Sequence, residues 1–296
     1  MTLVSVVVAT YRREGDLGRA LESLAAQTYP ALEIVLVDDN SDPEWNGKVA
    51  ELVNDFRASY PALPLTYIAN SENQGSAEAR NTGITVAKGA YITFLDDDDI
   101  YLPEKIEKQV GFMESGGYDY SITDLILYSE NGKEIDRRIR TYISDTSVSA
   151  LRRAHLKHHM TGTDTMMFRA EYLKEIGGFA PIDVGDEFYL MQRAIEGGGK
   201  FGYLPGCDIK AYVHTGEGGL SSGDRKIAGE NALFAYKKTF FPKLTKKDIR
   251  YIKMRHYAVI AYAELRRKAF LRFVSNAMRA FLASPLQFIM MIMDRS

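Results

Sequence analysis

Apolar, β-prone segments alternate with segments of helical spacing through the N-terminal third of this chain. The first of them, residues 3–9 (LVSVVVA), is nearly continuous in β-branched residues, as expected of a strand covered on both faces. The pattern predicts strands at 3–9, 33–37, 65–69 and 91–95, and helices around 17–24, 44–56 and 75–87. Such alternation favours parallel strands joined by right-handed crossovers, which bind ligands beyond the carboxyl ends of the strands. The sequence therefore predicts an α/β fold.

The pattern loosens after Pro103. We expect a helix to about residue 114, a strand pair near 118–128 turned by Asn131-Gly132, a β-like segment at 163–169, a helix at 186–195 and a strand at 208–213. The sequence from about residue 224 onward is predicted to be helical. The uncharged stretch 280–293 contains Pro285 and is shorter than the roughly 20 residues that span a bilayer, so it is a packed or an interfacial helix.

The 296 residues are 46% apolar, as in a globular protein of one large domain or two modest ones. The single cysteine, Cys207, excludes an internal disulfide and fits a reducing compartment. Residues 3–9 are too short for a secretory signal, and no basic flank or cleavage site accompanies them. We therefore expect the protein in the cytoplasm or peripherally on the cytoplasmic face of a membrane.

The charge is distributed unevenly along the chain. Residues 237–279 contain thirteen Lys or Arg against two acids, a net of +11. Because Asp294 and Arg295 cancel and the whole chain carries −2, residues 1–236 must carry −13. This asymmetry suggests two segments with different roles.

Four consecutive aspartates, Asp96 to Asp99, directly follow the predicted strand 91–95. Carboxylates stacked at the end of a buried strand repel one another, and a bound divalent cation relieves that repulsion. Hard oxygen ligands suit Mg²⁺ or Mn²⁺, and Mg²⁺ is often shared with substrate phosphates. The block therefore predicts a metal and phosphate site, with a solvated acidic turn as the alternative.

Two further groups lie near the same predicted edge. Asp39 follows the second strand, where it can bind a ligand or, as Asp often does, form a turn or cap a helix. Arg80 lies one or two turns into the helix that starts near Asn73, and can stabilise a phosphate or clamp Asp39 and Asp98. No G-x-G-x-x-G fingerprint follows the first strand, which argues against a dinucleotide cofactor.

Taken together, these motifs resemble the inverting family 2 glycosyltransferases of the GT-A fold. The resemblance covers roughly the first 220 residues and rests, in order, on Ser5-Val6-Val7-Val8, Thr10-Tyr11-Arg12, Ser23-Leu24, Gln27-Thr28-Tyr29, Val37 to Ser41, Asn73, Gly75, Ala79 to Asn81, Gly83, and Phe94 to Asp99. It implies a Rossmann-like three-layer α/β/α fold with a mostly parallel sheet. It also implies a nucleoside diphosphate sugar donor, with UDP as the expected nucleotide, and a divalent metal, Mn²⁺ or Mg²⁺.

The resemblance implies roles for individual residues. Asp98, the last position of the D-x-D element, would ligate the metal. The donor-binding residues would be Thr10, Tyr11, Asp39, Asn73, Arg80, Asp96 and Asp97, and the resemblance does not settle the individual roles of the extra acids Asp97 and Asp99. The domains would be a catalytic domain at 1–223, with a donor half at 1–103 and an acceptor half at 104–223, and a helical basic region at 224–296.

Glycosyl transfer also needs a carboxylate base for the proton of the acceptor. The segment from Gly185 to Arg193 resembles the base-bearing helix start of the family, in which the base precedes Leu by three residues and Arg by six. That spacing selects Glu187, with Asp186 as the close alternative. Acids at a helix N-terminus are also favoured by the helix dipole alone, which is the structural alternative for both.

His214 closes a predicted strand and opens the glycine-rich loop 215–223. In the family a histidine there meets the metal or the diphosphate, and an imidazole suits Mn²⁺. A lone histidine at a strand end is also a common structural residue. We assign His214 as a second metal ligand.

The basic segment interleaves Phe, Tyr and Ile with Lys and Arg before the uncharged stretch 280–293. Residues 237–293 either attach to an anionic membrane or pack as helices on the catalytic core, and both interpretations stay open. No recognised nucleic-acid module accompanies the charge, so nucleic acid is not an expected partner. The oligomeric state is not predicted.

The predicted function is metal-dependent transfer of a sugar, in the hexosyltransferase class, to the hydroxyl of a glycan or lipid-linked acceptor. Surface polysaccharide or lipopolysaccharide synthesis is the expected setting. The alternatives are a metal-dependent phosphohydrolase or nucleotidyltransferase, which would also need strand-end aspartates, and a catalytically silent sugar-nucleotide binding module.

Overall fold

The structure is a computed structural model that describes residues 1–13, 15–182, 185–213 and 223–293. The described chain divides into two compact units. The first comprises residues 1–148, 160–182 and 186–213, and the second comprises residues 149–159 and 223–293 together with Gly185. The boundary at 223/224 stays a prediction from the sequence.

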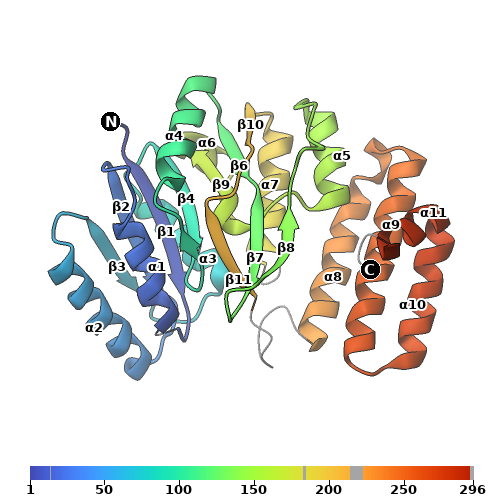
Figure 1. The fold of residues 1–296 in the computed structure, drawn as a ribbon, viewed down its shortest axis with the longest axis horizontal. Helices are drawn as coiled ribbons and strands as arrows, with labels where there is room; N and C mark the ends of the chain where they lie inside the picture. The colour runs from blue at the N-terminus through green and yellow to red at the C-terminus, as the bar shows by residue number, and fades with distance from the viewer. Residues whose placement is uncertain (14, 183–184, 214–222, 294–296) are drawn as a thin grey trace. The chain divides into compact units, whose positions relative to one another are not determined.

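Within the described residues, seven strands of the first unit form a central sheet in the order β10-β6-β9-β4-β1-β2-β3 (Figure 1). Their bounds are β1 Val4–Thr10, β2 Leu32–Asp38, β3 Leu65–Ala69, β4 Tyr91–Asp96, β6 Tyr120–Thr123, β9 Met166–Arg169 and β10 Phe201–Leu204. β1 runs parallel to β2 and to β4, and β2 runs parallel to β3, as the alternating pattern predicted. β9 is antiparallel to both of its neighbours, β4 and β6.

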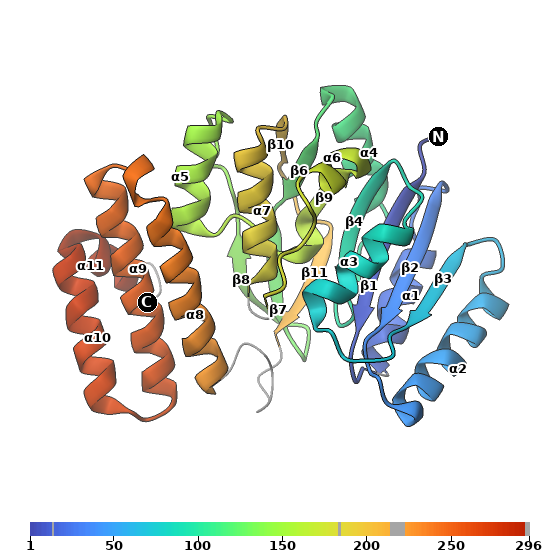
Figure 2. The same ribbon diagram turned by 180° about the vertical axis from the view of Figure 1, so that it is seen from behind.

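Helices cover both faces of this sheet. They are α1 (Gly15–Ala25), α2 (Pro43–Ser59), α3 (Ser76–Val86), α4 (Lys105–Gly116), α6 (Ala170–Glu175) and α7 (Asp186–Gly197). α1 lies in front of the sheet in Figure 1, and α3, α6 and α7 lie in front of it in the reverse view of Figure 2. The predicted three-layer α/β/α architecture is therefore confirmed.

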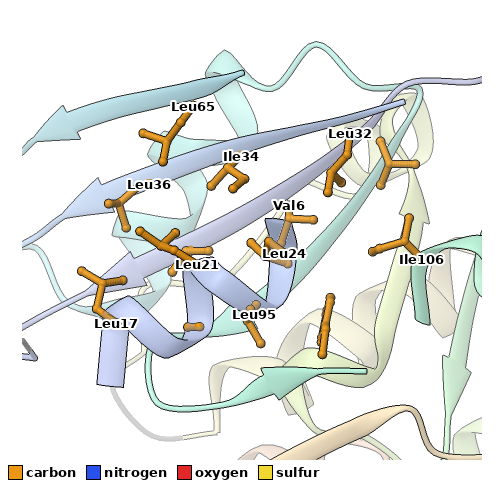
Figure 3. Packing of buried hydrophobic residues seen from close by; sticks show 14 of the residues in the cluster. Val6, Leu17, Leu21, Leu24, Leu32, Ile34, Leu36, Leu65, Leu95 and Ile106 are labelled. Atoms are coloured by element: carbon orange, nitrogen blue, oxygen red, sulfur yellow. The ribbon is translucent and has the colours of Figure 1, made fainter. Parts of the chain in front are cut away.

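The alternation of side chains along β1 explains its β-branched sequence. Val6 joins a buried cluster with Leu21 and Leu24 of α1 and with Ile34 of β2 (Figure 3). Val7 points to the other face, where a Cβ added to Gly83 of α3 would lie 2.4 Å from its Cγ1. Both faces of the strand are thus covered, and α3 approaches the sheet closely because position 83 has no side chain.

A second sheet has the order β5-β11-β7-β8 within the described residues, with β5 Ile100–Tyr101, β7 Leu125–Ser129, β8 Glu134–Arg138 and β11 Ile209–Val213. β7 and β8 form the hairpin, and Gly132 in its turn has φ 78°, as the Asn131-Gly132 pair predicted. The predicted pairing near 118–128 was wrong. β6 pairs with β9 and β10 because all four of its residues are buried and it belongs to the central sheet.

The β-like segment predicted at 163–169 is a strand only from Met166 onward. Residues Thr163–Thr165 form a single 3₁₀ turn, η1, before β9 begins. Other elements had no sequence prediction, among them the helices α5 (Val148–His158) and α6 and the strands β5 and β10.

The second unit is helical, as predicted for the chain after residue 224. It contains α5 (Val148–His158, from residue 149 onward), α8 (Gly223–Thr239), α9 (Lys246–Arg266), α10 (Phe270–Ala283) and α11 (Pro285–Met293). α9 packs against α8, α10 and α11. Asp248 of α9 is buried and accepts from Arg153 of α5 at 3.0 Å, which ties α5 to this unit. Among the described helices, none combines the length and the apolar character that a bilayer crossing requires.

Candidate active site

The carboxyl ends of β1, β2 and β4 lie side by side at one edge of the sheet. Thr10 of β1 is in register with Asp38 of β2, and Ala9 is in register with Asp96 of β4. The convergence of the strand-end residues that the sequence predicted is therefore confirmed.

Arg80 of α3 links this edge to the start of α7. Its Nη2 lies 2.6 Å from Asp96 Oδ1, and its Nη1 lies 2.5 Å from Asp186 Oδ2. Burial tends to lower the pKa of Arg80, but the two carboxylates outweigh burial and raise it, so the guanidinium stays charged. The sequence suggested that Arg80 pairs with Asp39 and Asp98. This was wrong, because α3 directs Arg80 toward α7, and its partners are Asp96 and Asp186.

Asp186 and Glu187 begin α7. Asp186 is buried: its Oδ2 also accepts from the hydroxyl of Ser76 at 3.2 Å, and its Oδ1 accepts from the Glu187 N–H at 2.8 Å. Burial raises the pKa of Asp186 to about 6 against the opposing effect of Arg80. Burial also raises the pKa of Glu187. Both carboxyls therefore titrate nearer to neutral pH than ordinary surface acids, as a general base requires.

Asp39 binds the loop that precedes α3. Its carboxylate accepts from Asn70 Nδ2 at 2.8 Å and from the backbone N–H groups of Gln74 and Gly75 at 2.9 and 2.8 Å. Asn73 Nδ2 donates to the carbonyl of Asp39 at 2.8 Å. The backbone N–H groups just before α3 thus bind Asp39 in this structure, and the donor roles of Asp39 and Asn73 stay predictions.

Asp97 and Asp98 face β1. The Thr10 hydroxyl donates to Asp97 Oδ2 at 2.7 Å, and the Tyr11 N–H lies 3.3 Å from the same oxygen. Burial and the neighbouring Asp98 raise the pKa of Asp97 to about 7. Asp98 Oδ2 accepts from Arg13 Nη2 at 2.9 Å. The predicted metal ligand is therefore paired with a cation of the chain itself in this structure.

A second set of carboxylates comes together at the end of β4. Asp96, Asp99 and Asp164 each offer an oxygen, and these oxygens lie within 4.8 Å of one another. Asp164 Oδ1 accepts from the Asp96 N–H at 2.8 Å, and Asp99 Oδ1 accepts from the Tyr212 N–H at 2.7 Å. Burial and Asp96 raise the pKa of Asp164 to about 7, and burial and Asp164 raise that of Asp99 well above its usual range.

The raised pKa values of Asp99 and Asp164 mean that their charged forms are disfavoured in this place. Three carboxyls share one place, with Asp99 and Asp164 buried and Asp96 partly exposed, so a proton or a cation must offset part of their charge. The donor set of hard oxygens fits Mg²⁺ or Mn²⁺. Sequence reasoning missed Asp164, which is a lone acid in the turn η1, and its only local signal is its place directly before the buried strand β9.

His214, assigned from the sequence as a metal ligand, lies outside the described residues, as do residues 215–222 of the glycine-rich loop. The nearest described residues on that side are those of β11, whose Tyr212 backbone bonds to Asp99.

A family model described as "Glycosyl transferase family 2" matches residues 5–177 of the 296. The chain belongs to this family. An uncharacterized glycosyltransferase of Methanocaldococcus jannaschii is 30% identical over 222 residues, which cover 74% of this chain and 73% of that protein. The Escherichia coli protein WfaP, named as a UDP-Glc:alpha-D-GlcNAc-diphosphoundecaprenol beta-1,3-glucosyltransferase, is 37% identical over 128 residues, 43% of this chain and 47% of that protein.

Several relatives of this family 2 chain are much longer than the matched part. An uncharacterized glycosyltransferase of Rickettsia felis is 36% identical over 135 residues, but the match spans only 21% of its length. For one from Haemophilus influenzae, 40% identical over 112 residues, the match spans 35%.

Solved structures show the same fold. TarS 1–349 of S. aureus has a TM-score of 0.64 at 18% identity, covering 97% of this chain and 82% of that one, and has also been solved with UDP-GlcNAc and with UDP. The mannosyltransferase PcManGT of Pyrobaculum calidifontis, solved with GDP-Man and Mn²⁺, has a TM-score of 0.63 at 18% identity, covering 99% and 79%. These likenesses confirm the GT-A fold that the motif order implied.

Proposed function

We propose that this family 2 protein transfers a sugar from a nucleoside diphosphate sugar to an acceptor hydroxyl, with inversion and with the help of a divalent metal. The observation that carries the proposal is the bridge made by Arg80, with 2.6 Å to Asp96 and 2.5 Å to Asp186. It joins the acidic strand end, where a donor is expected, to the acids of α7, where a base is expected. Donor activation and proton removal would thus occur within one network of side chains.

Glu187 is the proposed base. Asp186 is a weaker candidate because Arg80 and Ser76 both bind its Oδ2 and the Glu187 N–H binds its Oδ1. Burial raises the pKa of Glu187, which increases its proton affinity toward that needed to accept a hydroxyl proton near neutral pH. Asp186 is then a positioning residue that holds the first turn of α7 against Arg80.

The metal would be held by the aspartates at the end of β4. The resemblance implies Asp98, and the geometry offers Asp96, Asp99 and Asp164, whose oxygens lie within 4.8 Å of one another. A bound Mg²⁺ or Mn²⁺ would offset the charge of the departing diphosphate. Thr10, Tyr11, Asp39, Asn73 and Asp97 surround the same edge and would orient the nucleoside and the sugar.

The substrates are proposed from the relatives. The name of WfaP specifies a UDP-glucose donor and a diphosphoundecaprenol-linked acceptor, and TarS has been solved with UDP-GlcNAc. We therefore favour a UDP-hexose donor and a glycan or lipid-linked acceptor, in surface polysaccharide or lipopolysaccharide synthesis. Peripheral association with an anionic membrane through residues 237–293 belongs to the same proposal, because a lipid-linked acceptor is held at a bilayer.

The test is a panel of nucleotide sugars, incubated with and without Mn²⁺ or Mg²⁺. We expect metal-dependent release of a nucleoside diphosphate and a product with inverted anomeric configuration by NMR. Free phosphate or pyrophosphate would indicate a phosphohydrolase or nucleotidyltransferase instead. Donor binding without any turnover over the panel would indicate a silent binding module.

Two conservative variants test the base. Glu187→Gln should lower turnover about 10²–10⁴-fold while donor affinity is retained. Asp186→Asn should lower stability and turnover together, because it removes a partner of Arg80. Unchanged turnover in Glu187→Gln would refute the base assignment.

A pair of variants also separates the two metal sites. Asp98→Asn and Asp164→Asn each remove one carboxylate while keeping the side-chain shape. We expect Mn²⁺ affinity, measured by calorimetry, to fall in the variant whose residue ligates the ion. Unchanged affinity in both would refute a metal at the end of β4.

A further inference from the structure

The helices α10 and α11 expose an unusual amount of apolar surface. Among the described residues, eleven large exposed hydrophobic side chains lie between 270 and 293: Phe270, Leu271, Val274, Met278, Phe281, Leu282, Leu286, Ile289, Met290, Ile292 and Met293. In α10 only Ala280 is buried, and in α11 no residue is. A soluble surface rarely concentrates apolar side chains in this way unless something binds there.

The exposed side chains of α10 share one face. Counted from Val274, they lie at steps of three, four, seven and eight residues, the spacing of one side of a helix. In α11, Leu286, Ile289, Met290 and Met293 repeat the same spacing. We call these two faces together the α10–α11 face.

Within residues 265–293 all the charges are basic, and acids from outside this segment meet two of them: Glu264 lies 3.9 Å from Arg272 and Asp224 lies 2.8 Å from Arg267. From Leu265 to Met293 the sequence contains Arg266, Arg267, Lys268, Arg272 and Arg279 and no acid. Arg272 and Arg279 are seven residues apart, so they share a stripe along α10, and the Arg272 side chain is 70% exposed. Two copies packed through this face would bring like charges together, whereas an anionic lipid surface would attract them.

The lengths of the helices define how they can meet a bilayer. At 1.5 Å per residue, the 14 residues of α10 and the 9 residues of α11 measure about 21 and 14 Å, less than the roughly 30 Å hydrocarbon core. An apolar face with flanking Lys and Arg is the pattern of a helix that lies in the membrane interface. α9 is a poor alternative, because Ile252, Met254 and Ile260 are buried inside the helical unit.

We infer that the α10–α11 face binds the surface of a bilayer rich in anionic lipid, with both helices parallel to the membrane plane. This narrows the membrane association proposed above from residues 237–293 to 265–293. The proposed function explains why the protein would bind a membrane, but the binding itself is independent of it, because lipid binding requires no sugar transfer and is measured without substrates.

The test is flotation of the full chain with vesicles of phosphatidylcholine, with and without phosphatidylglycerol. The wild type should float with the anionic vesicles and dissociate at high salt. Leu282→Glu and Ile289→Glu should each weaken binding about tenfold or more, because a charge replaces an inserted side chain. Ala232→Glu, a matched charge change at an exposed position of α8, should leave binding unchanged.

A second pair of variants keeps the inference testable if the first do not fold. Arg266→Gln and Lys268→Gln are both at exposed positions, and together they should weaken binding to anionic vesicles only. Equal binding to zwitterionic vesicles, or Ala232→Glu as damaging as Leu282→Glu, would overturn the inference. A wild-type dimer that Leu282→Glu dissociates, without any lipid binding, would show that a second copy occupies the face. An active enzyme that does not float would refute membrane binding by the α10–α11 face and leave the proposed sugar transfer intact.

The helical unit also contains a cavity of about 70 Å³. Leu156, Leu233 and Ile252 are buried at its lining, and Lys157, Lys237 and Arg255 also line it. Glu230 is the acid of the lining, and Lys157 lies 3.5 Å from Asp248. The space is larger than one water needs, and cations predominate around it.

The electrostatics of the lining are consistent with an anion in this place. Burial lowers the pKa of Lys237 to about 8; Glu230 opposes this shift, and Arg255 acts in the same direction as burial. Burial and the neighbouring Lys237 and Lys238 lower the pKa of His256 to about 4. The Nδ1 of His256 is buried and has no hydrogen-bond partner among the described residues, and its ring stacks on Phe234 at 4.0 Å. We propose that this cavity binds a phosphate group, either free or on a lipid.

Calorimetry of the full chain with inorganic phosphate and with short-chain phosphatidic acid distinguishes the two sources. Lys237→Met and Arg255→Met should weaken binding about tenfold, whereas Lys253→Met and Arg250→Met, at exposed positions of α9, should not. By NMR, phosphate should raise the pKa of His256. Absence of binding, equal effects of all four variants, or an unshifted His256 would overturn the cavity site.

Discussion

The buried position of Arg80 leads to a large predicted loss of stability when its charge is removed. Arg80→Met keeps an apolar chain of similar length but leaves Asp96 and Asp186 without their cation. Breaking a buried ion pair by removing one partner costs about 3–5 kcal/mol, because an uncompensated charge remains in a dry place. An exposed pair contributes only about 0–1 kcal/mol.

Arg137→Met is the matched control. Arg137 makes two hydrogen bonds to Glu134, at 2.9 and 2.7 Å, but its side chain is 54% exposed. The two variants thus differ in burial more than in hydrogen bonding. We expect Arg137→Met to leave the free energy of unfolding close to that of the wild type, because solvent screens an exposed pair.

Urea unfolding followed by tryptophan fluorescence is the assay. The chain has a single tryptophan, Trp45 in α2, so the signal reports on the first unit. Linear extrapolation gives the free energy of unfolding for each variant. The double variant Arg80→Met/Asp186→Asn should recover part of the loss, about 1–3 kcal/mol, because only Asp96 then remains uncompensated.

The pH dependence adds a second criterion. Burial raises the pKa of Asp186 in the folded protein to about 6. Asp186 therefore contributes stability that is present below its pKa in the unfolded chain and is lost as the pH rises through about 6. Without Arg80 the pKa should rise further, so the loss caused by Arg80→Met should be smaller at pH 5 than at pH 8. Equal losses in Arg80→Met and Arg137→Met, or a larger loss at pH 5, would refute the reasoning.

Three further predictions follow from other contacts. Gly83→Ala should destabilise the first unit by about 1–3 kcal/mol in the same assay, because the new Cβ would lie 2.4 Å from Val7, whereas Gly47→Ala, with nothing within 4 Å in α2, should stabilise it by about 0.5–1 kcal/mol. If the base is an acid of α7, kcat/KM in the transfer assay should fall toward acid pH, because the base must be deprotonated and burial raises the pKa of both acids, that of Asp186 to about 6; a flat profile from pH 5 to 8 would contradict this. Asp248→Asn should loosen the contact of α5 with α9 and lower the helical stability seen by circular dichroism, because the carboxylate lies 3.0 Å from Arg153 and 3.5 Å from Lys157; an unchanged melting curve would show that the pairs contribute little.

Local patterns predicted the part of the site that lies on regular elements. The β-branched run before Thr10 and the apolar run before Asp96 fixed two strand ends, and parallel pairing then brought those ends together. Arg80 was found because it lies on a helix between them. Its partners were not, because the direction of a side chain depends on how α3 packs against β1.

Asp164 shows why the rest could not be predicted. It stands in a single 3₁₀ turn with no periodicity around it, and it reaches Asp96 only because β9 is inserted antiparallel beside β4. The assignment of α5 to the helical unit has the same cause: its ion pair with Asp248 joins residues 95 positions apart. Contacts between residues so far apart in the sequence produce no pattern in the residues around them, so the sequence alone does not predict them.

The position of β9 between β4 and β6 also affects how the chain emerges from the ribosome. β4 ends at Asp96, but its outer neighbour begins only at Met166. At 5–20 residues per second, synthesis of the intervening segment takes roughly 3–14 s, during which the β4 edge is unpaired. An unpaired apolar edge invites association with other chains, and charged residues beside it discourage this. We expect Asp96 to Asp99 to act as such gatekeepers, so that replacing them would increase co-translational aggregation before any folded site exists.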